Sequence, residues 1–213
     1  MPATKTKVAT AMMFYMSAQN ELAPRAQEDI DEISGNRKLE NVALYILLDT
    51  KAQDPATRKE IRTTKIWALP AGARDTDFAT PQTTPDVDVA DSRVFSRFLG
   101  DAEDHFDTLE TRQKILVLWG HGGGMVMLDQ DPAPGQQLSR ASIVDFAEKL
   151  EVRSRSPQDP LRFDIIAFDS CYMGVLETMH QFRGFADYAL VSSTVVDASG
   201  YPYKPIVANL IAD

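Results

Sequence analysis

The order of apolar and polar positions along the chain predicts short buried strands that alternate with amphipathic helices. Short apolar runs without a polar face suit strands that are buried on both sides. Such runs, which we predict to be strands, occupy residues 8–16, 41–48, 114–119, 162–168 and 188–193. Residues 61–69 alternate weakly and are rich in β-forming side chains, so we expect a strand there that pairs with the run at 41–48.

Several segments between these strands repeat their apolar residues at helical spacing. Residues 21–33 place apolar side chains three or four positions apart, which puts them on one face of a helix. The same reasoning predicts further helices at residues 87–106, 138–150, 174–182 and 205–212. Ser139 or Ser142 is a candidate N-cap of the helix at 138–150.

Proline, glycine and polar residues mark the remaining segments as loops, at residues 70–85 and 129–137, with a polar linker at 153–160. Strands that alternate with helices predict an α/β fold with a largely parallel sheet, formed by one domain over residues 1–213. In such sheets, ligands and reactive side chains collect at the carboxyl ends of the strands. Two of the predicted strand ends carry unusual chemistry, because His121 follows one and Cys171 follows another.

Composition narrows the class of protein. The 213 residues include 31 acidic and 22 basic side chains, and the formal net charge of −9 argues against non-specific binding to nucleic acid or anionic membranes. No apolar stretch approaches the roughly 20 residues that span a bilayer, and the N-terminus does not read as a secretory leader. We therefore expect no nucleic-acid or membrane partner, and a cytoplasmic protein, or a secreted one if a leader has been removed.

His121 lies in the glycine-rich segment WGHGGG, residues 119–124. Glycine lets the backbone approach a ligand closely, so His121 could act as a base while the N–H of Gly122 faces a developing oxyanion. A tight turn with an incidental histidine is an equally open interpretation. The same letters occur in the HGGG loop of esterases, but those enzymes also need a Gly-x-Ser-x-Gly elbow, which this chain lacks.

Cys171 is the single cysteine, so it forms no intramolecular disulfide and is either an inert buried residue or a reactive one. Its position between a strand and a helix would favour the thiolate, through nearby N–H groups and the positive helix end. A histidine in reach can take the thiol proton and later protonate a leaving amine. Cys171 follows His121 by about 50 residues, room for one crossover between neighbouring parallel strands.

Four blocks of the sequence resemble the clostripain family of cysteine peptidases, which belongs with caspases, gingipains, legumains and separase in one caspase-like fold. The blocks are FYMSAQNEL (14–22), ILVLWGHGGG (115–124), DIIAFDSCYMG (164–174) and ADYALVSSTVVDASGYPY (186–203). The histidine and cysteine blocks come in the family's order, each after an apolar strand. The resemblance implies a caspase-like three-layer α-β-α sandwich with a mainly parallel sheet.

The resemblance also implies a cysteine endopeptidase that works through a thioester. His121 would be the general base and acid, Cys171 the nucleophile, and the N–H groups of Gly122 and Cys171 the oxyanion hole. Asp169 matches the acid that lines the S1 pocket, the pocket for the residue before the cleaved bond, in relatives that cleave after Arg or Lys. A peptide or protein with Arg or Lys at that bond is the expected substrate, and residues 193–197 would form another wall of the cleft.

Relatives are often cut between the histidine and cysteine strands, and the cut can be autolytic. Arg140, Arg153 and Arg155 are the basic candidates for such a site here, with ordinary surface charges as the alternative. Because relatives usually run well past residue 213, we expect this chain to be the N-terminal part of a longer one and its sheet to be truncated at the C-terminus. The remainder of the chain or a regulatory partner could then be needed for activity.

No cofactor is required for this chemistry, and we predict no metal site. Calcium dependence occurs among relatives, but the acidic residues at 86–88 and 101–107 lack the spacing of a calcium loop. Glu177 and Asp187 could orient His121, although we assign no third catalytic residue.

The other histidines, His105 and His180, are expected to be structural or surface residues, and Trp67 and Trp119 to be core residues. The alternative to an enzyme is a caspase-like module kept for protein interaction without catalysis.

Overall fold

The computed structural model describes residues 6–36, 38–107, 109–132, 135, 137–155 and 161–212. Its strands and helices follow the chain in the order β1 (Thr6–Ala18), α1 (Ala23–Ser34), β2 (Val42–Gln53), β3 (Glu60–Leu69), the short 3₁₀ helix η1 (Asp75–Ala79), β4 (Gln82–Pro85), α2 (Ser92–Phe106), β5 (Leu109–Trp119), β6 (Val126–Gln130), β7 (Ser139–Ser142), α3 (Ile143–Ser154), β8 (Phe163–Asp169), α4 (Leu176–Phe182), β9 (Ala186–Leu190) and α5 (Tyr203–Ala212).

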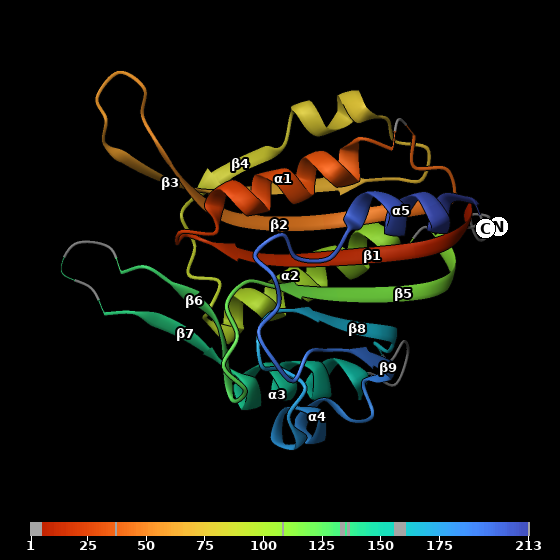
Figure 1. Ribbon diagram of the computed structural model, residues 1–213. Coiled ribbons are helices and arrows are strands. Elements are labelled where there is room, and N and C mark those ends of the chain that lie inside the picture. Colours follow the sequence, from red (N-terminus) through yellow and green to blue (C-terminus); the bar gives the residue numbers. More distant parts are fainter. Residues whose placement is uncertain are drawn as a thin grey trace.

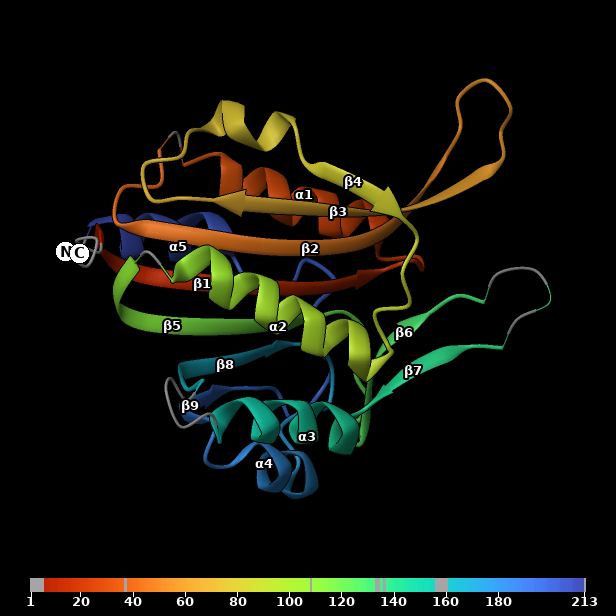
Figure 2. The same ribbon diagram turned by 180° about the vertical axis from the view of Figure 1, so that it is seen from behind.

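A seven-stranded sheet runs through the molecule in the order β4-β3-β2-β1-β5-β8-β9 (Figure 1). The strands β2, β1, β5, β8 and β9 are parallel, whereas β3 and β4 add an antiparallel edge. Helices α1 and α5 cover one face, and α2, α3 and α4 cover the other (Figures 1 and 2). The predicted three-layer α/β fold with a mainly parallel sheet is confirmed.

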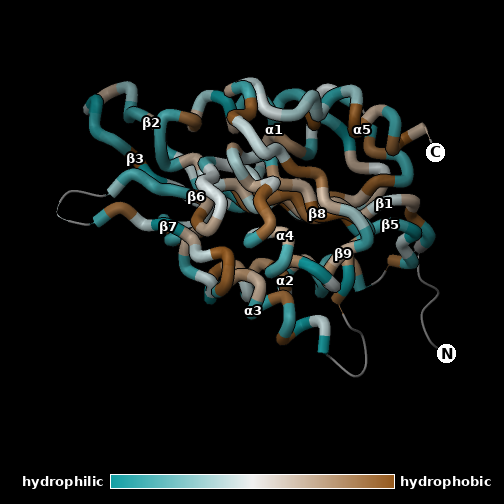
Figure 3. The backbone as a smooth tube through the Cα atoms, turned by 60° about the horizontal axis from the view of Figure 1, so that its bottom comes forward, coloured by the Kyte–Doolittle hydropathy of each residue, from teal (hydrophilic) through white to brown (hydrophobic). Residues whose placement is uncertain are grey.

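Burial on both faces explains why the central strands are apolar without interruption. In β1, Met12 and Phe14 pack beneath α1 and α5, while Met13 and Tyr15 pack beneath α2 and α3. Rings from separate elements meet on the second side, where the ring centres of Phe95 and Phe146 lie 4.2 Å apart. Hydrophobic segments accordingly concentrate in the middle of the molecule, and hydrophilic ones in the outer hairpins (Figure 3).

A buried polar cluster ties the β6–β7 hairpin to the carboxyl end of β2. Asp49 is fully buried and accepts hydrogen bonds from Gln19 Nε2 at 2.9 Å, from Thr64 Oγ1 at 2.9 Å and from the side chain of Gln130. Burial raises the pKa of Asp49 to about 8, and the charge of Asp86 adds to this rise, while the three hydrogen bonds oppose it. The cluster fixes the hairpin that follows the His121 loop.

The structure corrects the bounds of several predicted elements. The helix expected at 138–150 begins only at Ile143, because residues 139–142 form β7 and Ser142 caps the helix through Asp145 N. The loop expected at 70–85 contains η1 and β4. The linker expected to start at residue 153 starts later, because α3 continues to Ser154, and residues 156–160 lie outside the described residues.

Candidate active site

The carboxyl ends of β5 and β8 lie side by side at one edge of the sheet. Trp119, the last residue of β5, pairs in register with Asp169, the last residue of β8. Gly120 N then donates to Asp169 O at 3.2 Å, so the two chains are still in contact as they leave the sheet. This pairing delivers His121 and Cys171 to the same edge, as expected from the crossover between them.

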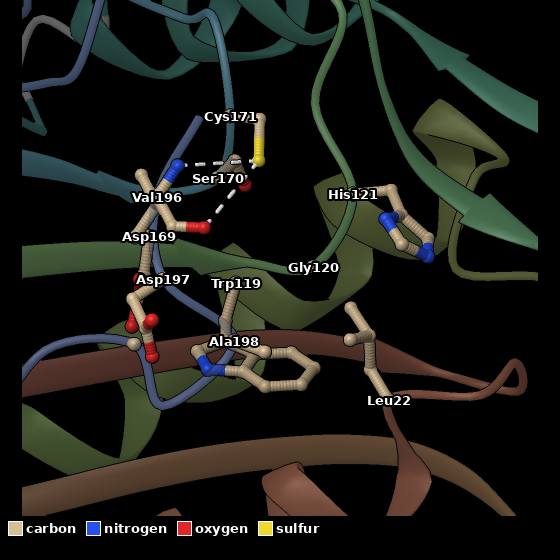
Figure 4. Close-up of a pocket in the computed structure, with 11 residues that line it drawn as sticks. Leu22, Trp119, Gly120, His121, Asp169, Ser170, Cys171, Val196, Asp197 and Ala198 are labelled. Atoms are coloured by element: carbon tan, nitrogen blue, oxygen red, sulfur yellow. Dashed lines mark hydrogen bonds between the residues drawn. The ribbon is translucent and has the colours of Figure 1, made fainter. Parts of the chain in front are cut away.

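A cleft opens at this edge and collects most of the residues that the sequence singled out. Its lining comprises Leu22, Trp119, Gly120, His121, Asp169, Ser170, Cys171, Val196, Asp197, Ala198 and Gly200. His121 and Cys171 stand on two sides of the opening, with the Trp119 indole and Leu22 across from them (Figure 4). Of the wall expected from residues 193–197, Val196 and Asp197 line the cleft, and the wall continues beyond them to Gly200.

Cys171 is partly buried, and its sulfur faces the backbone of Val196. Val196 N lies 3.4 Å from Cys171 Sγ and Val196 O lies 3.9 Å from it, which is hydrogen-bond range for sulfur (Figure 4). The expected helix after Cys171 begins at Leu176 instead of residue 174, so the cysteine lies in a separate turn and not on the first turn of that helix. In the described structure the Val196 N–H, and not the helix end, is therefore the donor that faces the sulfur.

His121 contacts an acid that no sequence pattern indicated. Its Nε2 lies 2.9 Å from Glu21 Oε1, at the start of the segment that leads into α1. The candidates Glu177 and Asp187 make no such pair in the described structure, and Asp187 instead pairs with Arg162. The described contacts also include no hydrogen bond between the His121 ring and Cys171 Sγ, so each side chain has its own partner.

Gly122 is packed too tightly against the cysteine turn for any larger residue. A Cβ atom placed on Gly122 would lie 2.3 Å from Cys171 O and 2.9 Å from Met173 Sδ. Within the described chain, the N–H groups of Gly122 and Cys171 donate no hydrogen bond, so both are free to bind a negatively charged oxygen from a ligand. The His121 loop therefore packs closely against the turn that contains Cys171, and an oxyanion hole formed by these two N–H groups stays a prediction.

Asp169 forms the buried acidic end of the cleft, with only 5% of its surface exposed. Its Oδ2 accepts hydrogen bonds from Tyr201 N at 3.0 Å and from the Tyr203 hydroxyl at 2.8 Å. Burial raises the pKa of Asp169, and these two hydrogen bonds oppose the rise. Gly200 approaches so closely that a Cβ there would lie 2.7 Å from Asp169 Oδ2. A positive charge close to such a carboxylate favours its charged form and so opposes the effect of burial.

Two further residues at the cleft gave no recognisable signal in the sequence. Ser170 is buried, and its hydroxyl has no hydrogen-bond partner in the described structure, although it lies in the cleft lining. Trp119 was expected only in the core. It is indeed buried, with 4% of its surface exposed, but that small exposed part lines the cleft.

The three arginines considered for self-cleavage lie in different surroundings. Arg140 is in β7 and pairs with Asp129 at 2.9 Å. Arg153 is inside α3, where it pairs with Glu103 and donates to Ser96 O at 3.0 Å. Arg155 follows the last residue of α3 and is the most exposed of the three. None of them belongs to the cleft lining.

The part of the chain that the structure describes contains no cluster of three or more His, Cys, Asp or Glu side chains that could hold a metal ion. In the acidic segment 86–88, Asp86 contacts Gln19 and Asp88 accepts a hydrogen bond from Ser139 Oγ at 2.7 Å. None of the helices in the described ranges has the length and apolar character to cross a membrane.

Comparison with known proteins gives two findings at the level of sequence. A family model described as the clostripain family matches residues 14–213. Clostripain from Hathewaya histolytica is 27% identical, over 94% of this chain but only 42% of the relative. The chain therefore spans less than half the length of that curated relative.

Solved structures agree with this assignment at the level of the fold. A secreted C11 cysteine protease from Bacteroides thetaiotaomicron, solved with an irreversible peptide inhibitor, superimposes with a TM-score of 0.70 at 23% identity, over 96% of this chain and 56% of the other. An inactive zymogen C11 protease from Parabacteroides distasonis gives a TM-score of 0.64 at 21% identity, over 99% of this chain and 55% of the other. These likenesses confirm the caspase-like fold.

Proposed function

The chain belongs to the clostripain family of peptidases, and we propose that it is a cysteine endopeptidase that cleaves peptide bonds after Arg or Lys. One observation carries the proposal. His121 and Cys171, from the neighbouring ends of β5 and β8, line a single cleft whose buried end is the carboxylate of Asp169. A nucleophile, a base and an acid for a basic side chain thus share one site.

The reaction follows from the groups in the cleft. His121 accepts the thiol proton, and Cys171 Sγ forms a bond to the carbonyl carbon of the substrate. The carbonyl oxygen becomes an oxyanion that accepts hydrogen bonds from the N–H groups of Gly122 and Cys171. His121 then protonates the leaving amine as the C–N bond breaks, which leaves a thioester. A water molecule, deprotonated by His121, attacks the thioester and releases the acid product and the thiol.

Both reacting side chains have to leave their present contacts before this sequence can begin. The sulfur of Cys171 must turn from Val196 toward the substrate carbonyl, and the ring of His121 must turn from Glu21 toward the sulfur. Hydrogen bonds between catalytic groups are often long or absent without substrate and form only in the complex.

The preference for Arg and Lys rests on the burial of Asp169. Burial deprives this carboxylate of the water that would stabilise its charge. A guanidinium or ammonium group that enters the cleft stabilises the charge in place of that water, so a basic side chain is the ligand that this position favours most. Asp169 Oδ1 accepts no hydrogen bond within the described structure, so one carboxylate oxygen remains for the ligand. The unpartnered hydroxyl of Ser170 offers a further polar group in the same lining.

Self-processing between the histidine and cysteine strands is the second part of the proposal. A peptidase site binds its substrate in an extended conformation, so a residue inside a helix is cut only after the helix unwinds locally. Arg155 is therefore the favoured site, Arg140 in the exposed hairpin the next, and Arg153 in α3 the least favoured. Purified chain should shorten with time, Cys171→Ala should stay intact, and Arg155→Ala should slow the cut more than Arg153→Ala.

A set of matched peptides that differ only in the residue before the cleaved bond tests the specificity. Peptides with Arg or Lys there should be hydrolysed, and those with Leu, Ala or Asp should not. Cleavage of an apolar or acidic peptide in preference to the basic ones would refute the assignment of Asp169. No cleavage of any peptide, together with an unreactive Cys171, would favour the non-catalytic interaction module.

The proposed chemistry uses no cofactor, and calcium dependence is a separate question that an EDTA-treated sample answers. We predict that EDTA leaves the hydrolysis rate unchanged. A cytoplasmic location stays a prediction from the sequence.

A further inference from the structure

A second buried acid lies behind the cleft. Asp29 is on α1, next to Ile30 and one turn from Ala26 and Ile33, and it is 4% exposed. Its Oδ2 accepts a hydrogen bond of 2.7 Å from Trp119 Nε1, which among the described residues is its one side-chain hydrogen bond to another element. A carboxylate among apolar residues costs free energy that an apolar side chain would not, so its presence requires a specific role.

Trp119 connects this acid to the cleft. The indole belongs to the last residue of β5 and lies across the opening from Cys171, between Leu22 and the segment that contains Asp197 (Figure 4). Its N–H is held by Asp29 on the buried side, which leaves the ring little freedom to tilt. The small exposed part of the indole, 4% of the residue's surface, therefore has a fixed position in the cleft lining, near the buried carboxylate of Asp169.

An aromatic ring in the cleft lining distinguishes the two basic side chains. The planar guanidinium of Arg can pack against the exposed part of the indole while it bonds a carboxylate with its edge, whereas the compact and strongly hydrated ammonium of Lys gains less from the same contact. A ring that could tilt would lose this contact but would still leave the Asp169 charge for either cation. The hydrogen bond behind the ring should therefore affect Arg more than Lys.

We propose that Asp29 is a positioning residue for substrate specificity, which fixes the Trp119 indole as a wall of the S1 pocket and so favours Arg over Lys. The inference rests on the proposed function, since it concerns the same cleft. Asp29 does not line the cleft and acts only through Trp119 and through its charge.

The charge of Asp29 has a second, separable effect. Burial raises its pKa to about 7, the charges of Asp169, Glu32 and Glu28 add to this, and the bond from Trp119 opposes it. The other groups that interact with it are the buried Tyr203 hydroxyl and the exposed Arg25. The carboxyl thus gains its charge as the pH rises through about 7 and then adds to the attraction of a cation in the cleft. Its oxygen can accept the indole N–H in either state.

Two substitutions separate the hydrogen bond from the charge. Asp29→Asn keeps an oxygen acceptor for Trp119 but has no charge, whereas Asp29→Ala removes both. The matched control is Asp31→Ala, which removes an exposed acid from the same helix. Each variant is compared with the unsubstituted chain by kcat and KM on an Arg peptide and a Lys peptide of otherwise identical sequence.

We expect Asp29→Ala to lower the Arg-to-Lys ratio of kcat/KM about three- to tenfold, the size of one cation–π contact, chiefly through a higher KM for Arg. Asp29→Asn should keep the Arg-to-Lys ratio within about twofold. In the unsubstituted chain, KM for the Arg peptide should fall as the pH rises through 7, and in Asp29→Asn this fall should be smaller. Asp31→Ala should change neither quantity.

An unchanged ratio in a folded Asp29→Ala, or an equal change in Asp31→Ala, would overturn the inference. If Asp29→Ala does not fold, Trp119→Phe removes the N–H but keeps an aromatic ring, and an unchanged ratio there would count equally against it.

Fluorescence gives a readout that does not require catalysis. In a Trp67→Phe, Cys171→Ala chain, Trp119 is the single tryptophan, and its emission should change on titration with the Arg peptide more than with the Lys peptide. Adding Asp29→Ala should abolish the difference between the two titrations, and a persistent difference would contradict the role of Asp29. If Trp119 reports Arg binding but the unsubstituted chain hydrolyses neither peptide, the proposed catalysis fails while this inference stands.

Discussion

Trp119 and Asp169 face each other in register at the ends of β5 and β8, and this pairing determines where the cleft forms. Each of the two residues ends its strand, and each is followed after one residue by a candidate catalytic side chain. The pair also supplies the aromatic and acidic walls of the cleft. Strand register, and not proximity in sequence, therefore assembles the site.

Gly122 should tolerate no side chain. In Gly122→Ala the new Cβ would meet Cys171 O at 2.3 Å, so the His121 loop would have to move and the two oxyanion donors would separate. Loss of one such donor lowers kcat by about 100-fold or more. The matched control is Gly123→Ala, where the nearest atom to a Cβ is Val126 Cγ2 at an ordinary 3.6 Å. Similar kcat values for the two variants would contradict the assignment of Gly122.

Asp169→Asn should remove the preference for basic residues. Truncation of one charge in a buried pair costs about 2–5 kcal/mol, so kcat/KM for Arg and Lys peptides should fall at least about 30-fold. Asp197→Asn is the control, because Asp197 lines the same cleft but is exposed. Loss of an exposed charge should change kcat/KM for these peptides by about fivefold at most. Equal losses in both variants would indicate a general effect of negative charge instead of a specific contact.

Glu21→Gln should have a small effect. The carboxylate of Glu21 is 72% exposed, so its contact with His121 is screened by solvent and cannot be a strong orienting contact. We expect kcat to change by less than about fivefold, in line with exposed ion pairs. Glu28→Gln, which removes an exposed acid of α1 that pairs with Arg25, is the comparison. A loss of two or more orders of magnitude in Glu21→Gln alone would make Glu21 a third member of the catalytic set.

Asp49 should make the protein less stable as the pH rises. Its pKa is raised from 3.8 to about 8, so the native chain retains a proton that the unfolded chain releases, and the free energy of unfolding falls between about pH 4 and pH 8. Asp49→Asn lacks this titration. In urea unfolding, the free energy of unfolding of Asp49→Asn minus that of the unsubstituted chain should therefore rise by more than about 1 kcal/mol between pH 5 and pH 8.

Asp54→Asn is the control for this titration. Hydrogen bonds from the backbone of residues 56 and 57 lower the pKa of Asp54, which therefore titrates below pH 5. The difference between Asp54→Asn and the unsubstituted chain should stay constant from pH 5 to pH 8. A constant difference for Asp49→Asn as well would show that Asp49 does not hold a proton in the native state.

The sequence was sufficient to predict the central sheet because burial on both faces leaves a simple pattern. Residues such as Phe14 and Tyr15, on opposite faces of β1, are both apolar, and this is what distinguishes a central parallel strand from a half-exposed one. The hairpin of β6 and β7 has no such pattern. Polar residues such as Ser139 and Arg140 form its second strand, and contacts with the sheet, including that of Gln130 with Asp49, hold it in place.

The site was predictable to the extent that glycine and strand ends mark it. His121 and Cys171 follow apolar strands directly, so the topology alone places them together. The contacts of Glu21 with His121 and of Asp29 with Trp119 were not predictable, since each joins α1 or its preceding segment to β5 across about 90 or more residues. An acid on the apolar face of an amphipathic helix was the available signal for Asp29.

Covalent labelling of Cys171 tests the central claim most directly. An acyloxymethyl ketone that carries Arg next to the reactive group should add one label to the unsubstituted chain, detected by mass spectrometry at the peptide that contains Cys171. Cys171→Ala should take up no label, His121→Ala should react far more slowly, and a matched reagent with Leu in place of Arg should react poorly. Equal labelling by the Arg and Leu reagents, or a rate unaffected by His121→Ala, would contradict a His121–Cys171 peptidase with a pocket for basic residues.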